Sequence, residues 1–167
     1  MANIQSERFS LWDAYRFEGF RPQTGRVRGV VGKKQSVIVP LQRSSKETCC
    51  GKCGTAHKGL YDCKAKQLRD LPCGRDQVYL EIEFRRLLCG KCGKVENEGL
   101  EWVADNGLYT KRFGKYLEQR CRESSIETVA KELDLAPEIV KEMKKYLRAR
   151  AEDGDTGFVF DEGVRRY

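Results

Sequence analysis

Apolar residues follow two different spacings along the chain. Residues 77–84 alternate strictly, and the apolar side chains at even-numbered positions share one face: Val78, Leu80, Ile82 and Phe84. Such alternation predicts a strand with one buried and one solvated face. From residue 99 onwards the apolar residues recur every three to four positions, which is the spacing of a helix. The pattern therefore predicts an α+β protein, with a small antiparallel β-domain followed by a three-helix domain.

Shorter patterns extend the predicted sheet. A short helix over 9–15 and a strand come first, and β-branched residues on both sides of Gly32-Lys33-Lys34 predict a hairpin over 27–41. Residues 68–72 predict a further short strand that ends in a turn. Arg85-Arg86 interrupts the alternation, which predicts a bulge or the end of the strand at that point.

The helical half carries start and stop signals. Thr110 is the expected N-cap of a helix over 111–122, and Ser124 with Glu127 has the spacing of a capping box for a second helix. A three-residue turn then leads to a third helix over 137–150, with proline at its first position. Helix, short turn and basic helix are typical of the helix-turn-helix motif. A plain three-helix packing module with a solvated basic face is the alternative.

The pentapeptide Cys-Gly-Lys-Cys-Gly occurs twice, starting at Cys50 and again at Cys89. Each copy can form a tight turn in which glycine adopts positive φ and both sulfurs face one point. Two such turns supply the four thiolates of a closed, tetrahedral structural zinc site. We therefore predict that Zn²⁺ is bound by Cys50, Cys53, Cys89 and Cys92.

Other roles for these cysteines stay open. A Cys-x-x-Cys pair also occurs in redox proteins, although the βαβ context of that motif is absent here, and disulfides or a different metal or cluster are further options. His57, the sole histidine, follows Cys53 by four residues and could replace one sulfur, but we expect a loop histidine. Three further cysteines are expected to be small buried side chains: Cys63, Cys73 and Cys121.

The charge of the chain indicates an acidic partner. Lys and Arg number 32 against 25 Asp and Glu, which gives a net charge of +7. No apolar run is long enough to span a bilayer, so we expect no membrane contact. A basic protein with a helix-turn-helix pattern favours double-stranded DNA as the partner, although solvated lysines would give the same composition. We expect the DNA contacts from these residues: Lys141, Lys144, Lys145, Arg148, Glu138, Lys111, Arg112, Arg85 and Arg86.

We divide the chain into three segments. Residues 1–98 form the β-hairpin and the zinc-binding domain with its four cysteine ligands, and 99–150 form the helix-turn-helix domain. Residues 151–167 are acidic and rich in turn-forming residues, which is typical of a linker or tail.

Several of these motifs, taken in order, resemble the N-terminal part of the ISL-three-type insertion-sequence transposases. They are Leu68-Arg69-Asp70-Leu71-Pro72, Val78-Tyr79-Leu80-Glu81-Ile82 with Arg85-Arg86, the two Cys-Gly-Lys-Cys-Gly copies, and the helical segment 125–133. The resemblance covers roughly residues 10–150. Cys73 stands where the family has an aromatic residue.

The resemblance implies a zinc-binding domain, a helix-turn-helix and then an RNase-H-like catalytic domain that uses Asp and Glu. Phe160-Asp161-Glu162 is similar to the first catalytic strand, whose partners would lie beyond Tyr167. We therefore expect a sequence-specific DNA-binding protein of transposition, without catalytic residues of its own. A stand-alone transcriptional regulator and a zinc-bound protein-interaction module are the alternatives. The resemblance also implies the bacterial cytoplasm, at the nucleoid, and allows a homodimer.

Overall fold

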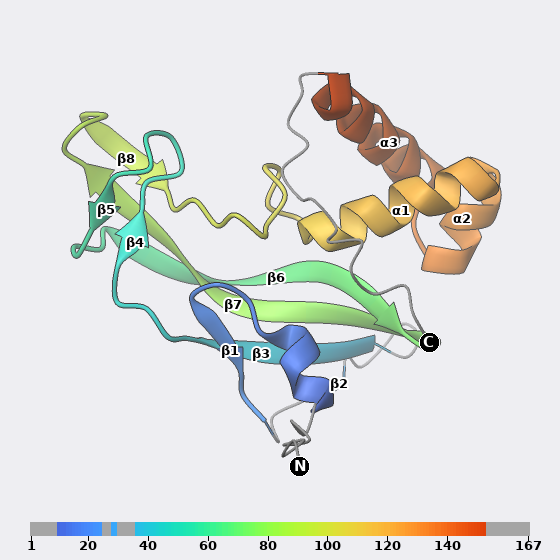
Figure 1. The fold of residues 1–167 in the computed structure, drawn as a ribbon, viewed down its shortest axis with the longest axis horizontal. Helices are drawn as coiled ribbons and strands as arrows, with labels where there is room; N and C mark the ends of the chain where they lie inside the picture. Colours follow the sequence, from blue (N-terminus) through green and yellow to red (C-terminus); the bar gives the residue numbers. More distant parts are fainter. Residues whose placement is uncertain (1–9, 25–27, 30–35, 153–167) are drawn as a thin grey trace, which may run out of the picture. The chain divides into compact units, whose positions relative to one another are not determined.

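The computed structural model describes residues 10–24, 28–29 and 36–152. It divides after Phe113 into two compact units, each described here by itself. The first unit holds a mixed β-sheet with a four-cysteine cluster, and three helices follow (Figure 1). This confirms the predicted α+β class. The turn Gly32-Lys33-Lys34 and the tail segment Phe160-Asp161-Glu162 lie outside the described residues.

The first unit begins with a short 3₁₀ helix and three strands. The 3₁₀ helix is Leu11–Tyr15, and the strands are β1 (Phe20–Pro22), β2 (Arg28–Gly29) and β3 (Ser36–Arg43). Both β1 and β2 pair antiparallel with β3, and the β2–β3 pairing agrees with the predicted hairpin.

A long hairpin forms the centre of the sheet. Strand β6 (Asp62–Cys73) pairs antiparallel with β7 (Asp76–Cys89), and β8 (Lys94–Asn97) pairs with the far end of β7. The strand expected over 68–72 is therefore much longer. Strand β7 also continues through Arg85-Arg86 to Cys89, so the predicted interruption there is wrong; the irregularity lies in β6, between Asp70 and Cys73.

The sheet is mixed, and not antiparallel throughout as predicted. Strands β3 and β7 pair in parallel, with Val37 opposite Val78 and Val39 opposite Leu80. Parallel neighbours need a long connection between them. Here that connection includes β4 (Thr48–Cys49), β5 (Ala56–His57) and all of β6, whose direction brings β7 back alongside β3.

Strand β7 contributes to two separate apolar clusters. Its even-numbered positions from Val78 to Phe84 are buried in the main core, as the alternation predicts, together with Phe20, Val39, Leu41 and Leu68. Leu87 and Cys89 belong to a second cluster with Cys50. Side chains alternate along a strand, and the pairing of β7 stays regular from Val78 to Cys89. The second cluster therefore lies on the opposite face of the strand.

Three helices complete the described chain: α1 (Lys111–Glu123), α2 (Ile126–Leu133) and α3 (Pro137–Glu152). Thr110 caps α1 as predicted, since its hydroxyl accepts a hydrogen bond from the Phe113 N–H at 3.2 Å. The predicted N-cap of α2 is one residue too early. Ser125, and not Ser124, accepts the bond from the Thr128 N–H at 3.2 Å.

The second unit packs its helices through small apolar faces. Val129, Ala130 and Leu133 of α2 are buried, as are Val140 and Met143 of α3. Asp134, with a left-handed φ of 53°, ends α2 and starts the three-residue turn to α3. The helix-turn-helix arrangement of α2 and α3 thus follows the predicted pattern of turn and helix starts.

Candidate metal centre

The two Cys-Gly-Lys-Cys-Gly segments fold into matching turns, which we call the first and second knuckles. In the first knuckle, the Gly54 N–H donates to the Cys50 carbonyl at 2.8 Å; in the second, the Gly93 N–H donates to the Cys89 carbonyl, also at 2.8 Å. Both glycines adopt positive φ, 70° and 71°. The repeated sequence therefore adopts the same backbone conformation twice, because only glycine takes positive φ at this position without strain.

Secondary structure brings the two knuckles together. Cys89 is the last residue of β7, and β8 folds back along it, so the second knuckle is the turn of a hairpin. Cys50 follows β4 and forms a bridge with Glu98, just beyond β8. The Gly51 N–H donates to the Asn97 carbonyl at 2.9 Å, which fixes the first knuckle against the end of β8. Both knuckles therefore lie at one end of the β6–β7 hairpin (Figure 1).

The four predicted sulfurs converge on one point. All four Sγ atoms lie within 4.8 Å of one another. Cys50 and Cys92 are 3.9 Å apart, and Cys53 and Cys89 are 3.5 Å apart. A tetrahedral zinc ion with Zn–S bonds of about 2.3 Å needs sulfurs separated by about 3.8 Å. The donor set and its spacing can therefore hold a metal ion such as Zn²⁺, with no position left open.

The environment of the sulfurs favours a bound cation. Hydrogen bonds with the side chain and the backbone of Thr55 lower the pKa of Cys53 to about 6, whereas burial and the neighbouring sulfurs raise the pKa of Cys92 to about 12. Burial and like charge oppose the ionisation of several adjacent sulfurs together. A divalent metal compensates this negative charge, since thiolates are its ligands.

The other cysteines and the histidine lie outside the cluster. Cys121 is buried as predicted, but Cys63 and Cys73 are exposed on β6, so the expectation of burial is wrong for both. The prediction failed because Cys63 and Cys73 lie towards the two ends of the long strand β6, and only its middle is buried. His57 lies in β5, opposite Thr48, and not in a loop; it is not among the four clustered ligands.

An ion pair between a buried carboxylate and a half-buried arginine joins β6 to the start of α1. Asp70, the central residue of the Leu-Arg-Asp-Leu-Pro motif, is fully buried and accepts a hydrogen bond from the Thr110 hydroxyl at 2.7 Å. Arg112 binds both carboxylate oxygens of Asp70, and its Nη1 donates to the Ala14 carbonyl at 2.7 Å. The DNA contact predicted for Arg112 would have to compete with this pair.

The two arginines of β7 are also engaged within the first unit. Arg85 binds Glu83 at 2.7 Å and the Thr48 hydroxyl at 3.2 Å. Arg86 forms an ion pair with Asp62, which is opposite it in β6. These partners give both arginines a role in holding the sheet, and their contact with DNA remains a prediction.

The residues predicted to contact DNA from α3 are mostly exposed. Glu138, Lys141, Lys145 and Arg148 face solvent, whereas Lys144 is half-buried and donates from Nζ to the Cys121 carbonyl at 3.4 Å. Lys111, at the start of α1, is half-buried. Lys141, Lys145 and Arg148 lie on the side of the helix opposite Val140 and Met143, because positions three, four and seven apart share a helical face.

Sequence reasoning did not find the residues that support the metal centre. Glu98 is buried and accepts two hydrogen bonds of 2.7 Å from Arg43 Nη2 and one from the Arg85 N–H. It thereby joins β3, β7 and the chain after β8 directly beside Cys50. A carboxylate near a glycine is too common in sequences to reveal such a role.

Comparison with known proteins gives one informative match. The chain is 28% identical over 122 residues to the transposase for insertion sequence element IS1001 from Bordetella parapertussis. The match covers 72% of this chain but only 30% of that transposase. No protein-family model and no solved structure matches the chain. Among the described residues, every helix is too short or too polar to cross a membrane.

Proposed function

We propose that this chain is a zinc-stabilised, sequence-specific double-stranded DNA-binding protein that serves as the end-recognition part of an ISL-three-type transposase. The observation that carries this proposal is the similarity to the IS1001 transposase over 72% of a chain that holds both the four-sulfur cluster and the helix-turn-helix. In this proposal residues 1–98 bind zinc and residues 99–150 recognise DNA.

In this proposal α3 is the recognition helix. Its exposed cations Lys141, Lys145 and Arg148 lie on one side and meet phosphates beside the major groove. Glu138, in the first turn, is placed where helix-turn-helix proteins read base edges, and a carboxylate there accepts a hydrogen bond from a cytosine amine. Phosphate contacts provide most of the affinity, and the first turn provides the sequence preference.

Zinc has a structural role in this proposal. The four sulfurs form a closed set of ligands, so a bound Zn²⁺ has no position for water or substrate. The apolar cluster around the two knuckles contains few buried residues, namely Leu87, Cys50 and Cys89. A metal site in such a small cluster contributes folding free energy directly.

Strand cleavage and joining are assigned to the part of the transposase that this match does not cover. The match spans 30% of the relative, and the described residues contain one clustered ligand set, which is all sulfur. Metal-dependent phosphoryl transfer uses carboxylate-bound Mg²⁺. We therefore propose that the chain binds transposon ends without cutting them, at the bacterial nucleoid, and that paired ends bring two copies together.

The test is a duplex titration with the zinc-loaded chain at several salt concentrations, combined with selection of bound duplexes from a random pool. We expect binding that weakens steeply with salt, and one enriched sequence. Replacing Lys141, Lys145 and Arg148 together by Gln should lower the slope of log affinity against log salt by about 3.

Arg75 provides the matched control, because it is an exposed cation in the turn between β6 and β7. Arg75→Gln should leave the slope unchanged. Absence of duplex binding by the wild-type chain at low salt would refute the proposed function, and equal binding of all sequences would reduce it to non-specific association.

A further inference from the structure

The first turn of α3 carries an apolar side chain that the second unit covers only in part. Ile139 is 46% exposed, although the next residue, Val140, is fully buried. The Val140 N–H donates to the Ala136 carbonyl at 3.2 Å, so the turn that holds Ile139 is fixed both by the helix and by the packing of its neighbour. Ile139 therefore has a defined position and an open apolar surface.

Helix stability does not explain an isoleucine at this position. The exposed residues around it in α3 are charged and favour helices: Glu138, Lys141, Glu142 and Lys145. Ile139 is β-branched, so it loses side-chain freedom in a helix and stabilises it less than these neighbours do. Among the α3 residues whose side chains are described, it is the one large apolar residue that is exposed. Single exposed apolar residues are common, so the place of Ile139 in the helix has to indicate its role.

The exposed surface of α3 consists of three strips. With 3.6 residues per turn, Ile139 lies about 60° from Glu142 and about 160° from Lys141 around the helix axis. Lys141 and Lys145 therefore lie along one edge, Ile139 lies at the other, and the carboxylates of Glu138 and Glu142 lie between them. The cationic edge matches a phosphate backbone, whereas carboxylates and an apolar side chain do not, and these match the edges of bases.

We propose that Ile139 is a specificity-determining residue that packs against the C5-methyl group of a thymine in the major groove. This role rests on the proposed function, in which α3 is the recognition helix and its first turn meets base edges. The thymine methyl is the apolar group that base pairs present in the major groove, and apolar side chains contact it. We therefore expect an A·T pair at one fixed position of the bound sequence, near the position that Glu138 contacts.

The first experiment removes the methyl group from the DNA and leaves the protein unchanged. Duplexes selected by the zinc-loaded chain are made with deoxyuridine in place of each thymine in turn, which deletes only the C5-methyl group. We expect one of these substitutions to weaken binding by about three- to fivefold, as for the loss of one buried methyl contact. Deoxyuridine at thymines outside the selected sequence is the control and should have no effect.

The variant Ile139→Ala assigns that loss to a residue. It should weaken binding to the thymine duplex by at least the same factor, and it should bind the thymine and uracil duplexes equally well, because the two changes remove one and the same contact. Circular dichroism checks that the variant keeps its helices.

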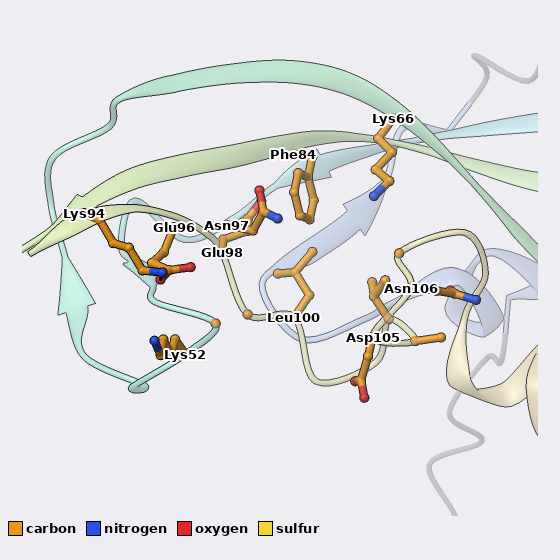
Figure 2. A pocket seen from close by; sticks show the side chains of 15 residues that line it. Lys52, Lys66, Phe84, Lys94, Glu96, Asn97, Glu98, Leu100, Asp105 and Asn106 are labelled. Carbon is orange, nitrogen blue, oxygen red and sulfur yellow. Dashed lines mark ion pairs between the residues drawn. The ribbon is translucent and has the colours of Figure 1, made fainter. Parts of the chain in front are cut away.

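Leu108 provides the matched control, since it is an apolar residue of the first unit with 65% of its surface exposed. It follows Asn106 and Gly107, which line the groove shown in Figure 2. That lining contains three lysines and three carboxylates, so its charges balance and do not attract a duplex. Leu108→Ala should therefore keep the full difference between the thymine and uracil duplexes.

Two results would overturn the role of Ile139 and leave the proposed function intact. One is a wild-type chain that selects a sequence but binds its uracil duplexes as tightly as the thymine duplex. The other is an equal response to uracil in wild type and Ile139→Ala, because another residue would then contact the methyl group. Failure of the wild-type chain to bind any duplex would instead refute the proposed function, and the role of Ile139 with it.

Discussion

Gly51 and Gly99 lie so close together that a side chain on either would collide with the backbone of the other segment. A Cβ atom on Gly99 would lie 2.9 Å from the Cα of Gly51, and one on Gly51 would lie 2.9 Å from the Asn97 carbonyl oxygen. The equivalent glycine of the second knuckle, Gly90, has no atom within 4 Å of its Cβ position. The two knuckles have the same five residues, but Gly51 has no room for a side chain whereas Gly90 does.

This contrast predicts unequal effects of one substitution. Gly51→Ala should destabilise the first unit by about 1–3 kcal/mol, because the backbone of the Asn97–Gly99 segment has to move. Gly90→Ala, the matched control, should change the stability by less than about 1 kcal/mol. Denaturant unfolding followed by tryptophan fluorescence measures both, and equal losses in the two variants would contradict the close approach.

Removing the metal ligands should affect folding and metal content together. Cys53→Ser and Cys89→Ser should each reduce bound zinc well below one ion per chain, whereas Cys63→Ser, an exposed cysteine outside the cluster, should leave it unchanged. Mass spectrometry under native conditions gives the metal content. A chelator should unfold the knuckles, and retention of zinc by Cys89→Ser would argue against the four-sulfur site.

The ion pair between buried Asp70 and half-buried Arg112 should matter for stability. Asp70→Ala leaves the Arg112 guanidinium without its carboxylate and should lower the free energy of unfolding by about 2–4 kcal/mol. Because Arg112 is partly exposed, water solvates it in the variant and limits the effect. Asp62→Ala removes a carboxylate from an exposed pair with Arg86 and should have little effect. Thermal unfolding of the two variants compares them directly. Similar midpoints would show that Asp70 is less isolated from water than its burial indicates.

The ion pair between α1 and α2 should make the stability of the second unit depend on pH. Hydrogen bonding to Arg120 lowers the pKa of Glu132. Because the folded pKa lies below the unfolded value of about 4.3, this contribution is present above about pH 4.3 and is lost as the pH falls through the folded pKa. Arg120→Gln should therefore destabilise the chain at about pH 6 and have less effect near about pH 3.

The measurement is the unfolding midpoint of wild type and variant across this pH range, together with the NMR titration of Glu132. Arg122 supplies the control, since it pairs with Glu118 within α1 and its side chain is 75% exposed. A difference between Arg120→Gln and wild type that persists unchanged at the acidic end of the range would exclude the Glu132 carboxylate as its cause.

Glu138 is the acidic residue in the first turn of the proposed recognition helix, which predicts a gain of affinity on its removal. Glu138→Gln should strengthen binding to random duplexes by about fivefold at low salt, as expected for the loss of about 1 kcal/mol of repulsion. It should also reduce the preference for the selected sequence. Glu101→Gln, at an exposed site in the first unit, should change neither property. Unaltered selectivity would place Glu138 away from the bases.

The strongest local patterns predicted the fold best. Alternation from Val78 to Phe84 correctly identified the buried face of β7, and Thr110 and Pro137 marked two helix starts. The repeated pentapeptide identified all four clustered sulfurs, because each turn is a local structure that its own five residues determine. Ser124 has the capping-box spacing to Glu127 and was therefore the predicted N-cap, but the hydroxyl of Ser125 accepts the hydrogen bond from the Thr128 N–H.

Relationships between distant segments could not be predicted in this way. The parallel pairing of β3 with β7 depends on where the chain returns after the first knuckle, and no residue of either strand specifies it. Glu98 and Arg43 meet across 55 positions of sequence, and Asp70 and Arg112 across 42. Such pairs become recognisable only when the sheet has brought their strands together.

Strand β7 presents the main core on one face and the metal cluster on the other, with the change of face between Phe84 and Leu87. An insertion or deletion of a single residue on either side of this point would turn one of the two clusters towards the wrong face. We expect length variation in relatives to be confined to the ends of the hairpin. Its interior should tolerate exchange of side chains but not a change in their number.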